Sequence, residues 1–388
     1  MAAQRFASGR RHKVMRILIG IALIGIVGFG VGAALLRTDD PDRLVVHEWG
    51  TITTRHAPDG TPDGRLNRID SADVLPSFVH RFEPDVTRDD SSRALGKSPL
   101  VPGRPDITMR LETPVIYFYP PDRGRMRPFD VSVRFRGGVL NEFYPSARAS
   151  LEVDVDRVNA KRERGLGLAW DGKMLDNYVV GALGWSGIAL NDNVRIPQTD
   201  HHAWLAPRHV RSTGVAVPGG EGERYLFYRG VAHLDAPVQT QRLGNEVVLR
   251  APRRAFWLDS GRATISKAWL VDVKAGGAVA FRDLGQLAFS REDGGATLAS
   301  ARLFGSGDHS AIGAATLRAS MNRALVDAGL FEDEADAMLE TRRESYFNTP
   351  GLRIFYLVPD EWIAYHLPLS ISEPAVVTRV IIGRIDLR

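Results

Sequence analysis

Three glutamates lie inside aromatic or apolar segments of this 388-residue chain: Glu48, Glu112 and Glu142. Such surroundings raise the pKa of a carboxyl group, as general acid catalysis requires. Two carboxyl groups held about 5 Å apart, or about 7–9 Å apart, are able to cleave a glycosidic bond. The alternative is structural, with each glutamate paired to one of the many arginines. The sequence leaves both interpretations open, because it does not show whether the three side chains converge.

Histidines near residue 200 supply a second candidate site. Asp200, His201 and His202 are followed by His209 in a polar stretch after Pro197. Imidazole and carboxylate ligands suit Zn²⁺ or a non-haem metal, so His201 and His202 are candidate metal ligands. No HExxH or HxH spacing accompanies them, and a metal site usually needs three protein ligands. The alternative is that both are loop residues with ordinary hydrogen bonds, and the sequence identifies no cofactor.

Aromatic side chains offer a third kind of contact, because indole rings stack on sugar rings as readily as they pack in a core. The candidates for either role are Trp49, Trp170, Trp185, Trp204, Trp257 and Trp269.

Strand patterns dominate the sequence up to about residue 290, so strands must position most of these candidates. Apolar and polar residues alternate over 129–136 and again over 151–156, which is typical of a strand with one packed face. Residues 115–119 are apolar or aromatic on both faces, which predicts a central, covered strand ending at Pro120. Gly137 and Gly138 predict a hairpin turn. Further strands are predicted at 44–54, 225–234, 246–250 and 263–273.

Helical periodicity is convincing only near the C-terminus. Leu317, Met321 and Leu325 are spaced one turn apart in a predicted helix over 311–328, and Gly329 ends it. A second helix is predicted from Glu332 to about residue 347, with acidic residues in its first turn. Two strands then close the chain, over 352–358 and 376–387. The last is apolar on both faces at 380–382, so it is predicted to be interior to a sheet.

The N-terminal segment predicts where the chain works. Residues 17–36 form 20 consecutive uncharged, mostly apolar residues, and a helix of that length just spans a bilayer core of roughly 30 Å. Basic residues precede this run and acidic residues follow it, which places the N-terminus in the cytoplasm and the C-terminal body in the periplasm. A cleaved signal peptide or a buried core helix are the alternatives. Gly28 and Gly32 have GxxxG spacing, which would allow a homodimer of such helices.

Charge and cysteine content exclude several classes. Five of the 50 basic residues lie before residue 17, which leaves 45 basic against 46 acidic residues in the rest. A nucleic-acid binder needs clustered cations, so we expect no nucleic-acid partner. The chain contains no cysteine, which excludes disulfides, thiolate nucleophiles, iron–sulfur clusters and Cys-ligated zinc.

Many short strands and few helices predict a mainly β fold. We expect a β-sandwich-like or mixed β-rich body with a C-terminal helix pair, preceded by one N-terminal transmembrane helix. The expected order is a cytoplasmic tail (1–16), the transmembrane helix (17–36), a β-rich extracytoplasmic domain (44–300) and a final segment (301–388). Charged composition allows a sub-boundary near 156–165. In the final segment, the helix pair and two closing strands pack on the β body.

Several segments together resemble a family of uncharacterised bacterial envelope proteins. They include His47-Glu48-Trp49-Gly50-Thr51 and the run Glu112-Thr113-Pro114-Val115-Ile116-Tyr117-Phe118-Tyr119, and similar segments continue to Val380-Ile381-Ile382-Gly383-Arg384. The resemblance covers most of the chain after the predicted transmembrane helix. It implies one extracytoplasmic unit in the bacterial envelope, and because the family has no established activity it transfers no catalytic residue.

Strong sheet patterning without a complete catalytic set favours a binding or envelope-organising module anchored in the inner membrane, with an unknown envelope ligand. The alternative is a carboxylate- or metal-dependent hydrolase that acts on envelope glycan or peptide. Glu48, Glu112, Glu142 and His202 are the first residues to test for that alternative.

Overall fold

The computed structural model describes residues 43–63, 75–84, 107–121, 126–154, 175, 178–258 and 261–387. The predicted cytoplasmic tail, the predicted transmembrane helix with Gly28 and Gly32, and the predicted sub-boundary near 156–165 lie outside these residues. Within the described ranges, no helix combines the length and apolar character needed to cross a membrane.

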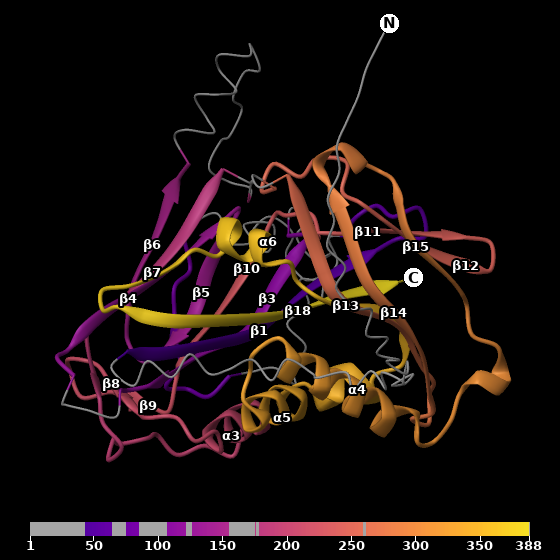
Figure 1. Ribbon diagram of the computed structural model, residues 1–388. Helices are drawn as coiled ribbons and strands as arrows, with labels where there is room; N and C mark the ends of the chain where they lie inside the picture. Colours follow the sequence, from indigo (N-terminus) through magenta and orange to yellow (C-terminus); the bar gives the residue numbers. More distant parts are fainter. Residues whose placement is uncertain are drawn as a thin grey trace, which may run out of the picture. The chain divides into compact units, whose positions relative to one another are not determined.

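A nine-stranded sheet forms the centre of the fold (Figure 1). Its strands in spatial order are β14 (Val279–Ser290), β13 (Arg262–Val273), β16 (Gly351–Leu357), β18 (Ala375–Leu387), β1 (Leu44–His56), β3 (Met109–Tyr119), β10 (Leu226–Ala232), β5 (Gly138–Tyr144) and β2 (His80–Arg81). β1 and β18 pair in parallel over their whole lengths. The first and last strands of the described chain therefore lie side by side inside the sheet.

Two smaller sheets pack on one face of the nine-stranded sheet. The first contains β17 (Leu369–Ile371), β4 (Phe129–Arg136), β7 (Val179–Leu190), β8 (Val215–Ala216) and β9 (Gly222–Glu223), with β6 (Arg148–Val153) paired to β7. The second contains β11 (Gln239–Leu243), β12 (Glu246–Arg250) and β15 (Thr297–Arg302). Val133 of β4 and Leu249 of β12 share one apolar cluster with Val46 of β1. This sheet-on-sheet packing makes the body mainly β and β-sandwich-like.

Helices cover the opposite face of the nine-stranded sheet. They are α3 (His202–Arg208), α4 (Gly313–Asp327), α5 (Glu332–Thr341) and a short π-helix (Glu344–Asn348). Leu317 of α4 and Met338 of α5 join Trp49 of β1 in a second apolar cluster. The remaining α-helix of the described residues, α6 (Asp360–His366), lies across β18 from this group in Figure 1. We refer below to the α4–α5 face and the α6 face of the sheet.

The apolar pattern of β1 explains why the strand is buried on both sides. Val46 and Ile52 enter the cluster on the α6 face, and Trp49 enters the cluster on the α4–α5 face. All three side chains have no exposed surface. Because side chains alternate along a strand, one central strand connects both cores.

Most predicted elements are confirmed. β3 lies between β1 and β10, and β18 lies between β16 and β1, so both are interior strands as predicted. Leu317, Met321 and Leu325 are all fully buried on α4. The second predicted helix is interrupted, because α5 ends at Thr341 and the π-helix covers residues 344–348.

The hairpin predicted at Gly137 and Gly138 is wrong. β4 ends at Arg136 and pairs with β7 and β17, whereas β5 begins at Gly138 and pairs with β10 and β2. Gly137 has a φ of 90°, which the tight turn requires. The turn therefore passes the chain from one sheet to the other. A sharp turn in the sequence does not show whether its two strands pair.

Candidate functional site

Glu48 lies in β1 and its side chain is fully buried. Its Oε1 accepts a hydrogen bond from the Tyr228 hydroxyl of β10, and its Oε2 pairs with Nε of Arg379 in β18. Burial raises the pKa of Tyr228 well above its usual value, and the charge of Glu48 raises it further. Burial lowers the pKa of Arg379, but the charge of Glu48 opposes this and the net pKa shift is upward. Glu48 is therefore the counter-ion of a largely buried arginine, whose side chain is 13% exposed.

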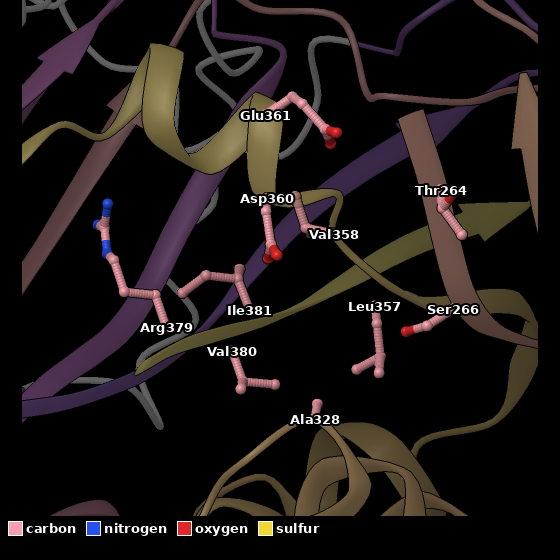
Figure 2. A pocket seen from close by; sticks show the side chains of 10 residues that line it. All are labelled: Thr264, Ser266, Ala328, Leu357, Val358, Asp360, Glu361, Arg379, Val380 and Ile381. Atoms are coloured by element: carbon pink, nitrogen blue, oxygen red, sulfur yellow. The ribbon is translucent and has the colours of Figure 1, made fainter. Parts of the chain in front are cut away.

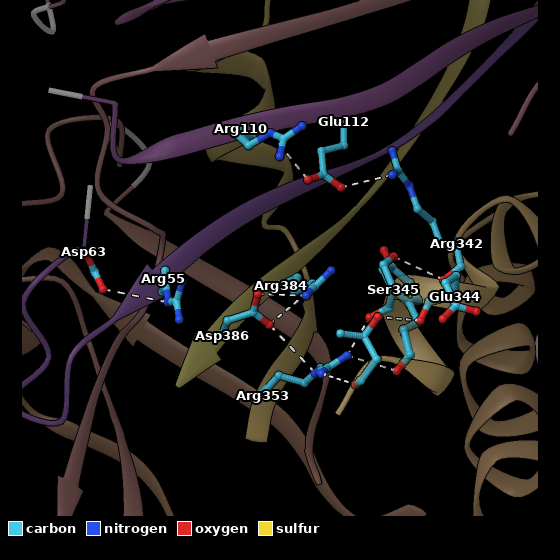
Figure 3. A network of polar contacts seen from close by, with 12 residues as sticks. Arg55, Asp63, Arg110, Glu112, Arg342, Glu344, Ser345, Arg353, Arg384 and Asp386 are labelled. Atoms are coloured by element: carbon cyan, nitrogen blue, oxygen red, sulfur yellow. Dashed lines mark hydrogen bonds and ion pairs between the residues drawn. The ribbon is translucent and has the colours of Figure 1, made fainter. Parts of the chain in front are cut away.

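Glu112 in β3 is held by two arginines (Figure 3). Its Oε2 lies 3.0 Å from Nη1 of Arg342, and its Oε1 lies 3.8 Å from Nε of Arg110. Arg342 also donates to Oγ1 of Thr113, whose φ of 49° is unusual for a residue with a side chain. This strained residue sits where the register between β1 and β3 shifts. Arg342 thus joins the irregular part of β3 to the segment that follows α5.

Glu142 in β5 also pairs with two arginines. Its Oε1 lies 3.5 Å from Nε of Arg81, and its Oε2 lies 3.9 Å from Nη1 of Arg229. The Glu142 side chain is 17% exposed, so water reaches it more than the other two glutamates.

The sheet itself separates two of the predicted catalytic residues. Glu48 alternates with Trp49 and lies on the α6 face together with Val46 and Ile52. Glu112 contacts Arg342, which follows α5 on the opposite face. Glu48 and Glu112 therefore do not share a cleft.

The two predicted metal ligands lie at the start of α3. His201 is the N-cap residue, His202 is the first helical residue, and their rings stack with centroids 5.2 Å apart. Across the described ranges, no three His, Asp or Glu side chains cluster in a way that would hold a metal ion.

The tryptophans within the described ranges pack in the core. Their exposure is 5% or less for Trp49, Trp185, Trp204, Trp257 and Trp269, and Trp170 lies outside the described residues. Faces this well covered are not available to stack on a sugar ring.

A cavity of about 280 Å³ lies where β16 ends (Figure 2). β16 stops at Leu357, but its two neighbours continue past it. β13 pairs with β16 only from Ala268 onward, and β18 pairs with β16 only from Ile382 onward. Among the described residues, no strand fills the space between the two continuing segments. The cavity is lined by Thr264, Ser266, Ala328, Leu357, Val358, Asp360, Glu361, Arg379, Val380 and Ile381.

The cavity passes from one face of the sheet to the other. Leu357 and Val380 belong to the cluster on the α4–α5 face, and Ala328 at the end of α4 packs against that cluster. Val358 and Ile381 belong to the cluster on the α6 face. In Figure 2, Asp360 and Glu361 extend from α6 on one side of β18, and Ala328 lies on the other side. The cavity therefore has an apolar wall and an acidic wall.

The acidic wall lacks a free counter-ion among the described lining residues. Arg379 is the only basic residue among them, and it already pairs with Glu48 of the neighbouring strand β1. Asp360 reaches solvent at the cavity mouth. Burial of the rest of its side chain raises the pKa of Asp360, and Arg379 offsets only part of that rise. A positively charged group in the cavity would meet two carboxylates whose charge Arg379 does not cancel.

The sequence contained a weak signal for this site. Pro359 followed by Asp360 and Glu361 is a typical helix start, but α6 is only seven residues long and has no clear apolar period. Arg379 stands between apolar residues of β18, with Val376 and Val377 before it and Val380 to Ile382 after it, and the sequence gave no sign of its partner. The cavity itself had no sequence signal, because it depends on where β16 stops relative to its neighbours.

A second cavity of about 310 Å³ lies between the 233–236 segment that follows β10, the 252–257 segment and the end of α6. Phe256, which is 42% exposed, and His366 form part of its wall, with Asp235 and Arg254 at the surface. His366 Nδ1 lies 3.0 Å from the carbonyl oxygen of Arg136. One acidic and one basic residue at its mouth give this cavity no clear charge preference, so it is the weaker candidate.

Neither the family models nor the curated proteins compared with this chain give a match. Of 27 solved chains that match, one is the Fcho1 Mu homology domain of Danio rerio, solved with a bound Eps15 peptide. That chain is 8% identical to this one, and the match has a TM-score of 0.27 over 89% of this chain and 95% of that chain. A TM-score this low carries no argument about function.

Proposed function

We propose that this chain is a binding module of the bacterial cell envelope, anchored in the inner membrane by residues 17–36 with its body in the periplasm. The ligand presents a basic group to the cavity at the end of β16. The apolar run and its flanking charges support the anchor and the orientation. The acidic wall of the cavity supports the choice of ligand.

One observation carries the proposal. Asp360 and Glu361 face a cavity whose single described arginine is already neutralised by Glu48. Carboxylates that are partly removed from water and lack a counter-ion favour a cationic ligand, because the ligand restores the missing charge. Glu48, Glu112 and Glu142 each pair with arginine, which favours a structural role for these carboxylates over the alternative of a hydrolase.

Fluorescein-labelled hexalysine tests this proposal against the detergent-solubilised full chain, with fluorescence anisotropy as the readout at low salt. We expect saturable binding that weakens at least about 10-fold in Asp360→Asn and in Glu361→Gln, since one ion pair is lost in each. Glu292→Gln is the matched control, because Glu292 is an exposed acid on the short helix Arg291–Asp293. Labelled hexaglutamate should not bind. Equal affinity of the Asp360, Glu361 and Glu292 variants would overturn the proposal.

A further inference from the structure

We infer that the ligand is an extended polypeptide segment that adds a strand along the open edge of β18, with basic and small apolar side chains alternating. This inference rests on the proposed function and names the chemical class of its ligand. Within the part of the chain that the structure describes, no strand pairs with residues 375–380 on the side that faces β16, and these residues form the open edge.

The free backbone groups of β18 can be identified from the ladder. Val358 N–H donates to the carbonyl oxygen of Ile381 at 2.9 Å, so the backbone groups of Ile381 point toward β16. Backbone groups of alternate residues in a strand point to the same side. The N–H and C=O groups of Arg379, Val377 and Ala375 therefore point toward the open side. The intervening residues direct theirs toward β1, the strand that pairs with β18 along its other edge.

The open edge is accessible beyond the cavity. Val377 is 43% exposed, which makes it one of the few large apolar side chains at the surface among the described residues. Six open residues correspond to an added strand of about 20 Å at roughly 3.4 Å per residue. A segment of about six residues thus matches the available edge.

The two walls of the cavity specify the side chains of such a segment. Paired residues in an antiparallel ladder place their side chains on the same face. A residue opposite Arg379 therefore points to the α6 face, toward Asp360 and Glu361, where a lysine or arginine is favoured. A residue opposite Val380 points to the α4–α5 face, toward Leu357 and Ala328, where a small apolar side chain fits. Because successive side chains of a strand point to opposite faces, a segment that adds here should alternate basic residues, which face the acidic wall, with small apolar residues, which face the apolar wall.

Two labelled hexapeptides of identical composition test this pattern on the full chain. One alternates valine and lysine, and the other has three valines followed by three lysines. We expect the alternating peptide to bind at least about 10-fold more tightly, and N-methylation of alternate backbone amides should remove that advantage. Equal affinity of the alternating and block peptides would overturn strand addition.

A substitution in β18 tests the backbone contact independently. Val377→Pro removes an N–H that points to the open side, and an edge position of this kind tolerates proline. Val377→Ala is the matched control, because it shortens the side chain and keeps the N–H. We expect the alternating peptide to bind at least about 10-fold more weakly to Val377→Pro than to Val377→Ala. Equal binding to both variants, with circular dichroism showing both folded, would contradict the inference.

Spermidine separates failure of this inference from failure of the proposed function. If spermidine and hexalysine bind and depend on Asp360, while the alternating and block peptides bind equally, the cationic site stands and strand addition fails. If no basic probe binds the full chain, the proposed function fails and this inference fails with it.

Discussion

Glu48 and Arg379 face each other across the parallel pair of β1 and β18, although 331 residues separate them in the sequence. This ion pair joins the first and last strands of the described chain inside the central sheet. It also holds the arginine that borders the acidic cavity. A carboxylate that looked suitable for general acid catalysis is therefore bound to a guanidinium group.

Glu48→Gln should destabilise the protein strongly. The substitution leaves the charge of Arg379 buried without its counter-ion, and breaking a buried pair on one side typically costs about 3–5 kcal/mol. Urea unfolding of the full chain in detergent measures the loss. Glu152→Gln is the control, since Glu152 pairs with Arg134 at 2.8 Å and both side chains are exposed (49% and 46%), so we expect a loss of at most about 1 kcal/mol. Unchanged stability of Glu48→Gln would contradict a structural role.

Acid should weaken the fold through His56. Burial lowers the pKa of His56 to about 4, and His56 Nδ1 lies 2.7 Å from Thr240 Oγ1. Between the unfolded value of 6.5 and about 4, the unfolded chain binds the proton more tightly than the folded protein does. The contribution of neutral His56 to the free energy of unfolding is complete above pH 6.5 and is lost as the pH falls toward 4. It amounts to about 3 kcal/mol, at roughly 1.4 kcal/mol per unit of pKa difference.

The measurement is urea unfolding at several pH values for the wild type and for His56→Gln. The difference between the two free energies of unfolding isolates His56 from other titrating groups. A difference that does not change with pH would show that His56 is not buried as a neutral ring.

Gly383→Ala should be among the most damaging single substitutions in β18. A Cβ at this position would lie 2.0 Å from Cζ of Tyr356, whose ring is fully buried and cannot move aside. We expect a loss of more than about 2 kcal/mol, measured by thermal unfolding. Gly184→Ala in β7 is the control, because no heavy atom lies within 4 Å of its added Cβ. A similar melting temperature for both variants would contradict the close packing of Tyr356.

Binding of hexalysine should weaken as the pH falls. Burial raises the pKa of Asp360, so this carboxylate takes up a proton at a higher pH than an ordinary aspartate does. Protonation removes a negative charge from the acidic wall and lowers cation affinity. Anisotropy titrations from pH 7 downward should show a loss of hexalysine affinity in the wild type that the Asp360→Asn variant does not show. Identical pH profiles for wild type and Asp360→Asn would remove Asp360 from the site.

Membrane anchoring and orientation are tested by a phosphatase fused to the C-terminus. Phosphatase activity requires export, so the full-length fusion should be active and should sediment with membranes. A fusion that lacks residues 17–36 should be inactive and remain in the cytosol. An inactive full-length fusion would overturn the proposed orientation.

The sequence by itself determined the local elements and the chemical exclusions. Alternation over residues 129–136 identified β4, and apolar residues on both faces at 115–119 and 380–382 identified interior strands. These features follow from side-chain periodicity, which is written into neighbouring residues. The absence of cysteine excluded disulfide and thiolate chemistry, because this conclusion depends only on the amino-acid composition and not on how the chain folds.

Only the tertiary structure decided which distant residues meet. It paired Glu48 with Arg379, placed Glu112 on the other face of the sheet, and ended β16 before its neighbours. It also showed that the turn at Gly137 connects two sheets rather than two paired strands. Each outcome depends on strand order and register between segments far apart in the chain, and no local pattern encodes that order. A site that exists because one strand is shorter than the two beside it becomes visible only when all three are aligned.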